Sequence, residues 1–266
     1  MIDSQKPPKS LHWLTSLESI DPQNEPLPPP DSSGESTPRG LLHSLRSLLD
    51  VGPFDWKCAV ILTLGTILLT VVHYQSKFYT LDDRYRLFAW FGVNFVALLL
   101  VPLLVIRFVF RERLADYGFQ LGDYRQWGKF LLIFLAVMVP VAAIASRIPE
   151  FHDYYPRYKP ILDNRLMILP SMAGWLLYFM AWEFFFRGFM LMGLGKRLGP
   201  IAIFIQMVPF TMAHFPKPEL ESFAAIIAGV ALGIMAWRTK SFVGPWLLHW
   251  LAATSMDVFV VFWPLR

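Results

Sequence analysis

Cysteine is almost absent from this sequence of 266 residues, in which Cys58 is the single example. One cysteine excludes an internal disulfide and a metal cage built from cysteines. Any nitrogen-based metal binding or acid–base chemistry must therefore come from the six histidines, which are His12, His43, His73, His152, His214 and His249.

Charged residues are also scarce, at 17% of the chain, where soluble domains carry about 25%. Apolar residues make up 55% of the sequence, with 23 Phe and 10 Trp, and the mean hydropathy is +0.43. The formal net charge is only +4, so nothing indicates a nucleic-acid-binding surface. This composition predicts an integral membrane protein whose surroundings are the lipid bilayer.

The N-terminal region differs from the rest of the chain. Residues 1–40 contain eight prolines and cannot bury a core, so we predict a disordered tail. No apolar segment lies near Met1, which predicts that there is no cleavable signal peptide. Within 41–55 the leucines share one helical face, with polar side chains opposite. That pattern suits an amphipathic helix on the membrane surface, or equally one packed against the first span.

Seven apolar stretches follow the tail. The first four and the seventh reach the roughly 20 residues that a helix needs to span the hydrocarbon, and the fifth and sixth are shorter. The sequence predicts an all-α polytopic membrane protein of about seven transmembrane helices, with residues 56–164 as a scaffold and 165–266 as a C-terminal four-helix bundle. The predicted spans are 56–75, 87–109, 130–148, 166–194, 198–214, 222–237 and 242–264.

The lysines and arginines outside the spans are distributed unevenly between the two sides. Apart from Arg187, which falls within a span, 14 lie on the side of the tail and nine on the other. The positive-inside rule then predicts a multi-pass protein of the cell membrane with a cytoplasmic tail. No internal repeat is visible, which argues against a transporter built from inverted repeats.

Ionisable residues inside the predicted spans gather in the C-terminal half. Away from their ends the first three spans have almost none, whereas the last four contain Glu183, Arg187, His214, His249 and Asp257. Such residues face the bundle interior, pair with one another and mark functional sites. Glu183 and Arg187 are four residues apart and share a helix face. We therefore predict that one carboxylate and two imidazoles meet in one cavity.

Two chemistries suit this group of side chains. Glu183 can activate a water molecule as a general base, while the two histidines polarise a carbonyl group. Alternatively, His214, His249 and Glu183 form a zinc site with two histidines and one carboxylate. The sequence leaves both open, so the expected cofactor is either none or zinc.

The same residues also have structural explanations. Glu183 and Arg187 can simply neutralise each other within one helix, and a buried histidine can be a structural hydrogen-bond donor. Asp257 lies on the same helix face as His249, two turns away, either pairing with it or serving only as a supporting residue.

Three short motifs resemble those of the CPBP family, which includes type II CAAX prenyl endopeptidases and bacteriocin-processing membrane proteases. The family pattern is EExxxR, FxxxH and then HxxxN or HxxxD on successive helices. The matching segments are Trp182–Gly188, Phe210–His214 and the pair Leu248-His249. The resemblance covers about residues 165–262, and the segment Ala115–Gly122 is similar to the stretch that precedes the family domain.

The sequence departs from the family pattern at two positions. Trp182 stands where the motif has its first glutamate, which is usually taken as the base, and Ala253 stands where Asn or Asp is expected. Either Glu183 has become the base in a variant subfamily, or the site is degenerate. The residues that the resemblance transfers are Glu183, Arg187, Phe210, His214 and His249.

The resemblance implies an intramembrane endopeptidase that cleaves a membrane-anchored peptide or protein. One alternative is a non-catalytic relative that acts as a pseudoprotease or an immunity-type membrane scaffold. A third hypothesis, a proton-coupled transporter, rests on Glu183 and Asp257 as membrane-embedded carboxylates.

The predicted orientation can be tested by cysteine labelling. In a background with Cys58 replaced by Ala, a cysteine introduced at Ser32 should react with a membrane-impermeant thiol reagent only from the cytoplasmic side. Labelling of that cysteine only from the outside would reverse the orientation.

Overall fold

A computed structural model describes residues 55–77, 80, 81 and 83–263 of the chain. These residues belong to a unit that runs from Pro53 to Arg266. The tail predicted at 1–40 lies outside the described residues, as does the amphipathic helix predicted at 41–55 apart from Asp55.

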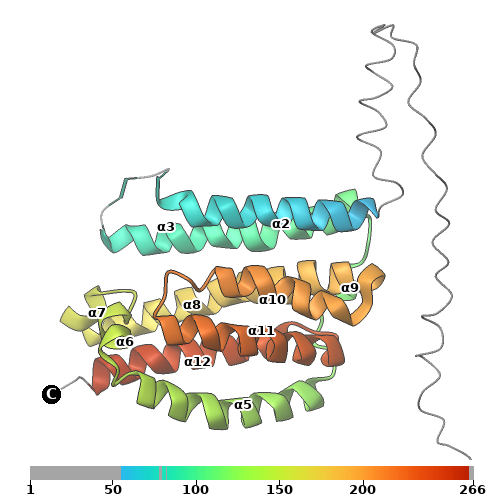
Figure 1. Cartoon of the computed structure of the whole chain (residues 1–266). Coiled ribbons are helices and arrows are strands. Elements are labelled where there is room, and N and C mark those ends of the chain that lie inside the picture. Colours follow the sequence, from blue (N-terminus) through green and yellow to red (C-terminus); the bar gives the residue numbers. More distant parts are fainter. Residues whose placement is uncertain (1–54, 78–79, 82, 264–266) are drawn as a thin grey trace, which may run out of the picture. The chain divides into compact units, whose positions relative to one another are not determined.

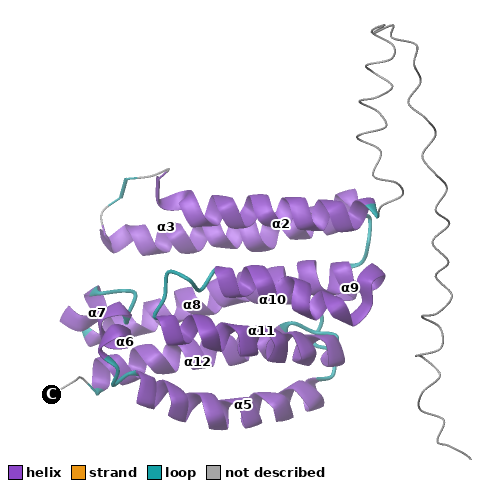
Figure 2. Cartoon of the chain, in the orientation of Figure 1, coloured by secondary structure: helices purple, strands orange, loops and turns teal. Residues whose placement is uncertain are grey.

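The described residues form helices joined by short connections and contain no strand (Figures 1 and 2). The longer helices include three π-helical stretches, η2, η3 and η6. In chain order the helices are α2 (Trp56–Tyr74), η1 (Gln75–Lys77), α3 (Asp83–Phe95), η2 (Val96–Leu100), α4 (Val101–Leu104), η3 (Val105–Val109), η4 (Leu114–Tyr117), α5 (Tyr124–Ala145), α6 (Pro149–Tyr154), α7 (Pro160–Asp163), η5 (Arg165–Met167), α8 (Ile168–Glu183), η6 (Phe184–Met192), α9 (Gly193–Leu198), η7 (Gly199–Ile201), α10 (Ala202–Met212), α11 (Glu219–Thr239) and α12 (Val243–Phe262).

Local sequence determines where several of these helices begin and end. The Asp55 carboxylate accepts a hydrogen bond from the backbone N–H of Cys58 at 3.0 Å and caps the start of α2. Asp123 caps α5 in the same way, through the N–H of Gln126 at 2.9 Å. At the other end of a helix, Lys240 adopts a left-handed conformation with φ of 55° and stops α11.

The number of membrane-spanning segments differs from the prediction. Among the described residues, six segments are long and apolar enough to cross a membrane, where the sequence predicts about seven, because the fourth predicted span and most of the fifth fall within one segment, Arg165–Met212. The chain reverses inside this segment at Gly199, whose φ of 63° favours glycine, and α10 then packs back along η6. At 1.5 Å per residue, the 11 residues of α10 extend only roughly 16 Å, about half a bilayer core.

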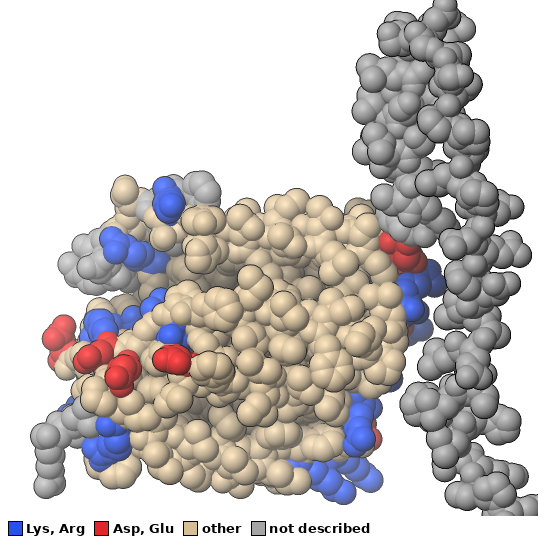
Figure 3. Space-filling model, viewed as in Figure 1, with Lys and Arg blue, Asp and Glu red and all other residues tan. Residues whose placement is uncertain are grey.

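The distribution of charge on the surface fits a membrane protein. Figure 3 shows Lys, Arg, Asp and Glu side chains near the two ends of the helices, with a wide band free of charged side chains between them. Many large apolar side chains of the described helices are exposed, such as Leu132, which is 70% exposed on α5. Because a lipid-facing surface must be apolar, this pattern confirms an all-α polytopic membrane protein.

The continuous helix formed by α8, η6 and α9 is the centre of the fold. It contacts α2, α3, α10, α11 and α12, whereas α5 packs mainly on α12 at the edge of the bundle (Figure 1). Every residue of η6 is buried. π-Helical turns are frequent at functional sites, and this one begins directly after Glu183 and contains Arg187.

A small polar cluster joins three elements at one end of the bundle. Glu112 forms ion pairs with Lys57 on α2 and Lys196 on α9, and it accepts a hydrogen bond from the hydroxyl of Tyr117 at 2.9 Å. Burial alone would raise the pKa of Glu112, but the hydrogen bonds from the two lysines and from Tyr117 lower it to about 2. Burial and the neighbouring carboxylate raise the pKa of Tyr117.

We expect Glu112 to make folding stability depend on pH. Its pKa falls from 4.5 to about 2 on folding, so its contribution is complete above pH 4.5 and disappears as the pH falls towards 2. Glu112→Gln should lower stability near neutral pH by roughly 1–3 kcal/mol and should flatten the acid branch of the profile.

Thermal unfolding of the protein in detergent between pH 2 and 7 measures this effect. Glu219→Gln is the control, because Glu219 is exposed and forms no ion pair within the part of the chain that the structure describes. Identical acid branches for wild type and Glu112→Gln would contradict the assignment.

Candidate active site

Three helices bring the predicted site residues together around the middle of the central helix. Glu183 is the last residue of α8 and Arg187 lies one turn later in η6, while His214 follows the end of α10 and His249 lies on α12. Because α10 packs on η6 and α12 packs on α8, both histidines face the central helix. The structure brings His249 into contact with Glu183 and places the rings of His214 and His249 6.3 Å apart.

Both carboxylate oxygens of Glu183 have a charged or polar neighbour. Oε1 is 2.6 Å from Nδ1 of His249, and Oε2 is 3.1 Å from Nε of Arg187. The side chains of Glu183 and Arg187 are both 0% exposed. The contact between these two side chains is an ion pair without a hydrogen bond, since Oε2 and all three guanidinium nitrogens lack a hydrogen-bond partner among the described residues.

Phe210 connects the arginine to the first histidine. The guanidinium carbon of Arg187 lies 4.2 Å from the centre of the Phe210 ring, within the range of a cation–π interaction. The backbone carbonyl of Phe210 is 2.8 Å from Nδ1 of His214 and accepts its hydrogen bond. One phenylalanine therefore supports both groups, which gives a physical reason for the FxxxH spacing.

The tautomer of His214 follows from this hydrogen bond. A carbonyl oxygen can only accept, so Nδ1 carries the proton, and Nε2 of the neutral ring is a free acceptor. The rings of His214 and His249 lie nearly parallel, with centroids 6.3 Å apart and planes 17° apart. Neither Nε2 atom has a hydrogen-bond partner among the residues described, so both can take up a ligand.

Glu183, Arg187, His214 and His249 are called the Glu183 group. Asp257 lies apart from it. It is 4% exposed, its Oδ1 has no hydrogen-bond partner in the described chain, and it does not pair with His249. Its electrostatic neighbours are the side chains Arg157, Lys159, Lys217 and Glu221 at the end of the bundle. Of the two options that the sequence left open for Asp257, pairing with His249 is absent.

Sequence reasoning missed the polar contacts around Asp257. The hydroxyl of Tyr155 donates to Glu221 at 2.7 Å, and Lys217 pairs with the other oxygen of Glu221 at 2.7 Å. Burial, together with the Glu221 charge, raises the pKa of Tyr155. The sequence suggests only that Glu221 favours the first turn of a helix, because no motif links it to a tyrosine 66 residues earlier.

The zinc alternative does not fit the donors as they are arranged. The described residues contain no group of three or more His, Cys, Asp and Glu side chains that could hold a metal ion. Glu183 directs Oε1 to His249 and Oε2 towards Arg187, so its two oxygens already have other partners. A catalytic zinc ordinarily has three protein ligands, and we assign no step to a metal.

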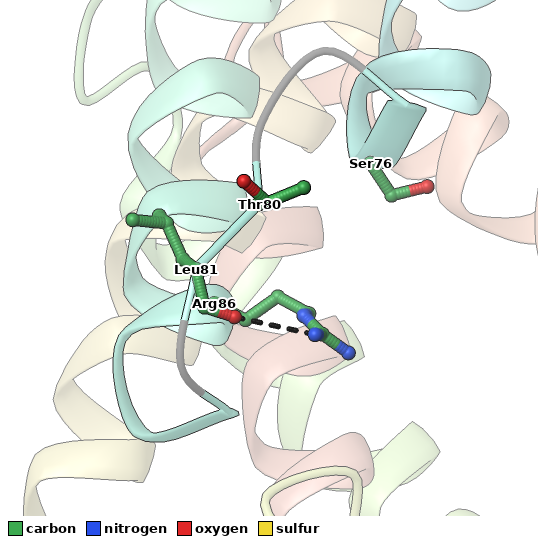
Figure 4. Close-up of a pocket in the computed structure, with 4 residues that line it drawn as sticks. All are labelled: Ser76, Thr80, Leu81 and Arg86. Carbon is green, nitrogen blue, oxygen red and sulfur yellow. Dashed lines mark hydrogen bonds between the residues drawn. The ribbon is translucent and has the colours of Figure 1, made fainter.

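A hollow of about 520 Å³ lies elsewhere, where α2 and η1 connect to α3 (Figure 4). Ser76, Thr80, Leu81 and Arg86 line it, and Arg86 donates a hydrogen bond to the Leu81 carbonyl at 3.2 Å. No residue of the Glu183 group lines this hollow, so we do not assign it to the candidate active site.

The fold and this buried group define a helical membrane protein with a cluster of ionisable side chains in its C-terminal half. Residues 164–255 match the family model described as type II CAAX prenyl endopeptidase, Rce1-like. The match covers about a third of the chain, includes Glu183, Arg187, His214 and His249, and confirms the resemblance to the CPBP family. No curated protein and no solved structure matches the chain.

The buried ion pair generates a prediction about stability. Arg187→Gln leaves the Glu183 carboxylate buried without its cation and should destabilise the protein by roughly 3–5 kcal/mol. The double variant Glu183→Gln/Arg187→Gln should lose much less, because no charge is left unpaired. Unfolding of both variants and of Glu183→Gln in detergent completes a double-mutant cycle.

The pair Lys217–Glu221 provides the control for this cycle. It has the same spacing of four residues, but its side chains are 24% and 22% exposed. Lys217→Gln should therefore cost about 1 kcal/mol or less. Equal losses in Lys217→Gln and Arg187→Gln would show that burial of the Glu183 pair has no special effect.

Proposed function

We propose that this protein is an intramembrane endopeptidase that hydrolyses a peptide bond in a membrane-associated peptide or protein. The observation that carries the proposal is the buried Glu183 carboxylate, which holds His249 through one oxygen and leaves the other without a hydrogen bond. The match to the CAAX protease family over residues 164–255 supports the same class of reaction.

In the proposed reaction Glu183 is the general base. Oε2, which has the Arg187 guanidinium beside it but no hydrogen bond among the described residues, accepts a hydrogen bond from a water molecule and takes the proton as the water attacks the carbonyl carbon. Arg187 compensates the negative charge of this carboxylate in its buried surroundings. The proton then passes from Glu183 to the leaving amine.

The two histidines have different proposed tasks. Nδ1–H of His249 donates to the Glu183 carboxylate, and in the proposed reaction this ring is an imidazolium whose Nε2–H donates to the oxygen of the scissile carbonyl. The neutral His214, whose Nδ1 is held by the Phe210 carbonyl, offers its Nε2 lone pair to the attacking water. The water is thus held by two acceptors before it reacts.

The surroundings of the site favour a substrate anchored in the bilayer. The Glu183 group lies within helices that have an apolar outer surface, and aromatic rings such as Phe179 and Phe186 surround it. We propose the cell membrane as the location, with the tail in the cytoplasm. The family description suggests a prenylated CAAX peptide as a first probe.

A non-catalytic membrane scaffold, such as a pseudoprotease or an immunity-type protein, is the second candidate. Two departures from the family motifs favour it, because Trp182 cannot serve as a base and Ala253 has no amide to donate. In such a protein the Glu183 group would hold the helices together and would bind a membrane peptide without cutting it.

Cleavage assays distinguish the two candidates. Purified protein in detergent is incubated with a farnesylated CAAX peptide and with a library of membrane-segment peptides, and products are read by mass spectrometry. Glu183→Gln should lower the rate by about 10²–10⁴-fold, the usual contribution of a general base, while the exposed control Glu219→Gln should keep wild-type activity. Binding without cleavage by the wild type would support the scaffold.

A further inference from the structure

The indole of Trp182 has an unused hydrogen-bond donor inside the protein. The side chain is 7% exposed, and its Nε1 atom has no partner among the residues that the structure describes. An indole nitrogen can only donate, and a buried donor without an acceptor loses its hydrogen bonds to water without replacement. An unpaired donor in a protein interior therefore calls for an explanation, and one explanation is a ligand that accepts.

Trp182 packs beside the Glu183 group. It precedes Glu183 directly, and its ring lies 6.2 Å from the His214 ring at an angle of 76°. It also lies 6.2 Å from the Phe210 ring, which in turn covers Arg187. The unpartnered N–H is therefore carried by a ring that contacts one of the two proposed catalytic histidines.

The proposed reaction needs hydrogen-bond donors to the oxygen of the scissile carbonyl, and the residues that match the family motifs supply only one. Ala253 lacks the side-chain amide that an Asn would provide at this position. Neutral His214 presents a lone pair at Nε2, because its proton is at Nδ1. That leaves His249, as an imidazolium with protons on both ring nitrogens, as the one ring that can donate to the carbonyl oxygen. A second donor would stabilise the charge that develops there.

We infer that Trp182 donates a hydrogen bond from Nε1 to the oxygen of the scissile carbonyl, a role that rests on the proposed endopeptidase activity. As the water oxygen bonds to the carbonyl carbon, the C=O π electrons move to the carbonyl oxygen and the water proton moves to Glu183. The N–H of Trp182 stabilises this oxyanion without transferring its own proton. The oxyanion then re-forms the C=O bond as the C–N bond breaks, the C–N electron pair goes to nitrogen, and Glu183 returns the proton there to give an amine and a carboxylic acid.

Trp175 provides a matched control on the same helix. Its Nε1 is also buried without a partner, seven residues before Trp182. Its ring contacts are aromatic, including Phe91 at 5.0 Å and Phe179 at 5.5 Å, and none involves His214 or His249 within the described chain. Trp175→Phe therefore removes an unpaired indole N–H at a distance from the reacting groups.

Kinetics on the cleaved peptide test the inference. Trp182→Phe removes the N–H but keeps an aromatic ring, and it should lower kcat by about 10²–10³-fold, the effect of losing one oxyanion donor, with KM within twofold. Trp175→Phe should stay within threefold of the wild type. If Trp182→Phe does not fold, the isosteric benzothienylalanine at position 182 replaces only N–H by sulfur.

Inhibitor binding gives a second measurement that does not depend on turnover. A phosphinate analogue of the cleaved peptide carries a charged tetrahedral oxygen, whereas the matching reduced-amide peptide does not. Removal of the Trp182 N–H should weaken phosphinate binding about 10²-fold and leave binding of the reduced amide unchanged.

The outcomes separate this inference from the proposed function. Wild-type rates in the Trp182 variants, or equal losses in the Trp175 and Trp182 variants, would overturn the donor role and leave the endopeptidase in place. If the wild type cleaves no peptide of the library, the proposed function fails and the donor role fails with it.

Discussion

Burial of the charge pair Glu183–Arg187 constrains the arrangement of the surrounding helices. Neither side chain has any exposure, so each charge depends on the groups packed around it instead of on water. His249 on α12 compensates one side of the carboxylate, and the Phe210 ring on α10 covers the guanidinium. The bundle must keep α10 and α12 against the central helix, because withdrawal of either one would leave a charge in apolar surroundings.

This constraint explains why polar function is confined to one half of the molecule. The central helix is enclosed by neighbouring helices on several sides. By contrast, α5 lies almost entirely on the outside, and only 6% of its most apolar stretch is buried. An ionisable group on such a peripheral helix would face lipid. The continuous helix of α8, η6 and α9 is the place where a carboxylate and a guanidinium can be enclosed by protein.

The two departures from the family motifs occupy different positions in this enclosure. The ring of Trp182 packs against the rings of His214, Phe186 and Phe210. A large aromatic side chain therefore occupies the position where the family motif has a glutamate. Ala253 is packed against the apolar core. The chain thus carries one carboxylate at this turn of the helix, and the chemistry of the site centres on Glu183.

The sequence alone determined the fold class, the family resemblance and the residues that come together. Composition and apolar runs identify a helical membrane protein, and the spacing of Glu183 and Arg187 places both on one helix face, because these are properties of single segments. Most of the spans follow from the same local signal. The tail and the surface helix lie outside the described residues and stay predictions.

Only the tertiary structure decided the contacts between segments. The contact of His249 with Glu183, the ring contact of Trp182 with His214, the pairing of Tyr155 with Glu221 and the separate environment of Asp257 all depend on how helices rotate and pack. The reversal at Gly199 likewise turns α10 back along η6, within the apolar segment Arg165–Met212. Apolar periodicity shows which face of a helix is buried but not which neighbour it meets, so residues 66 positions apart find their partners only through packing.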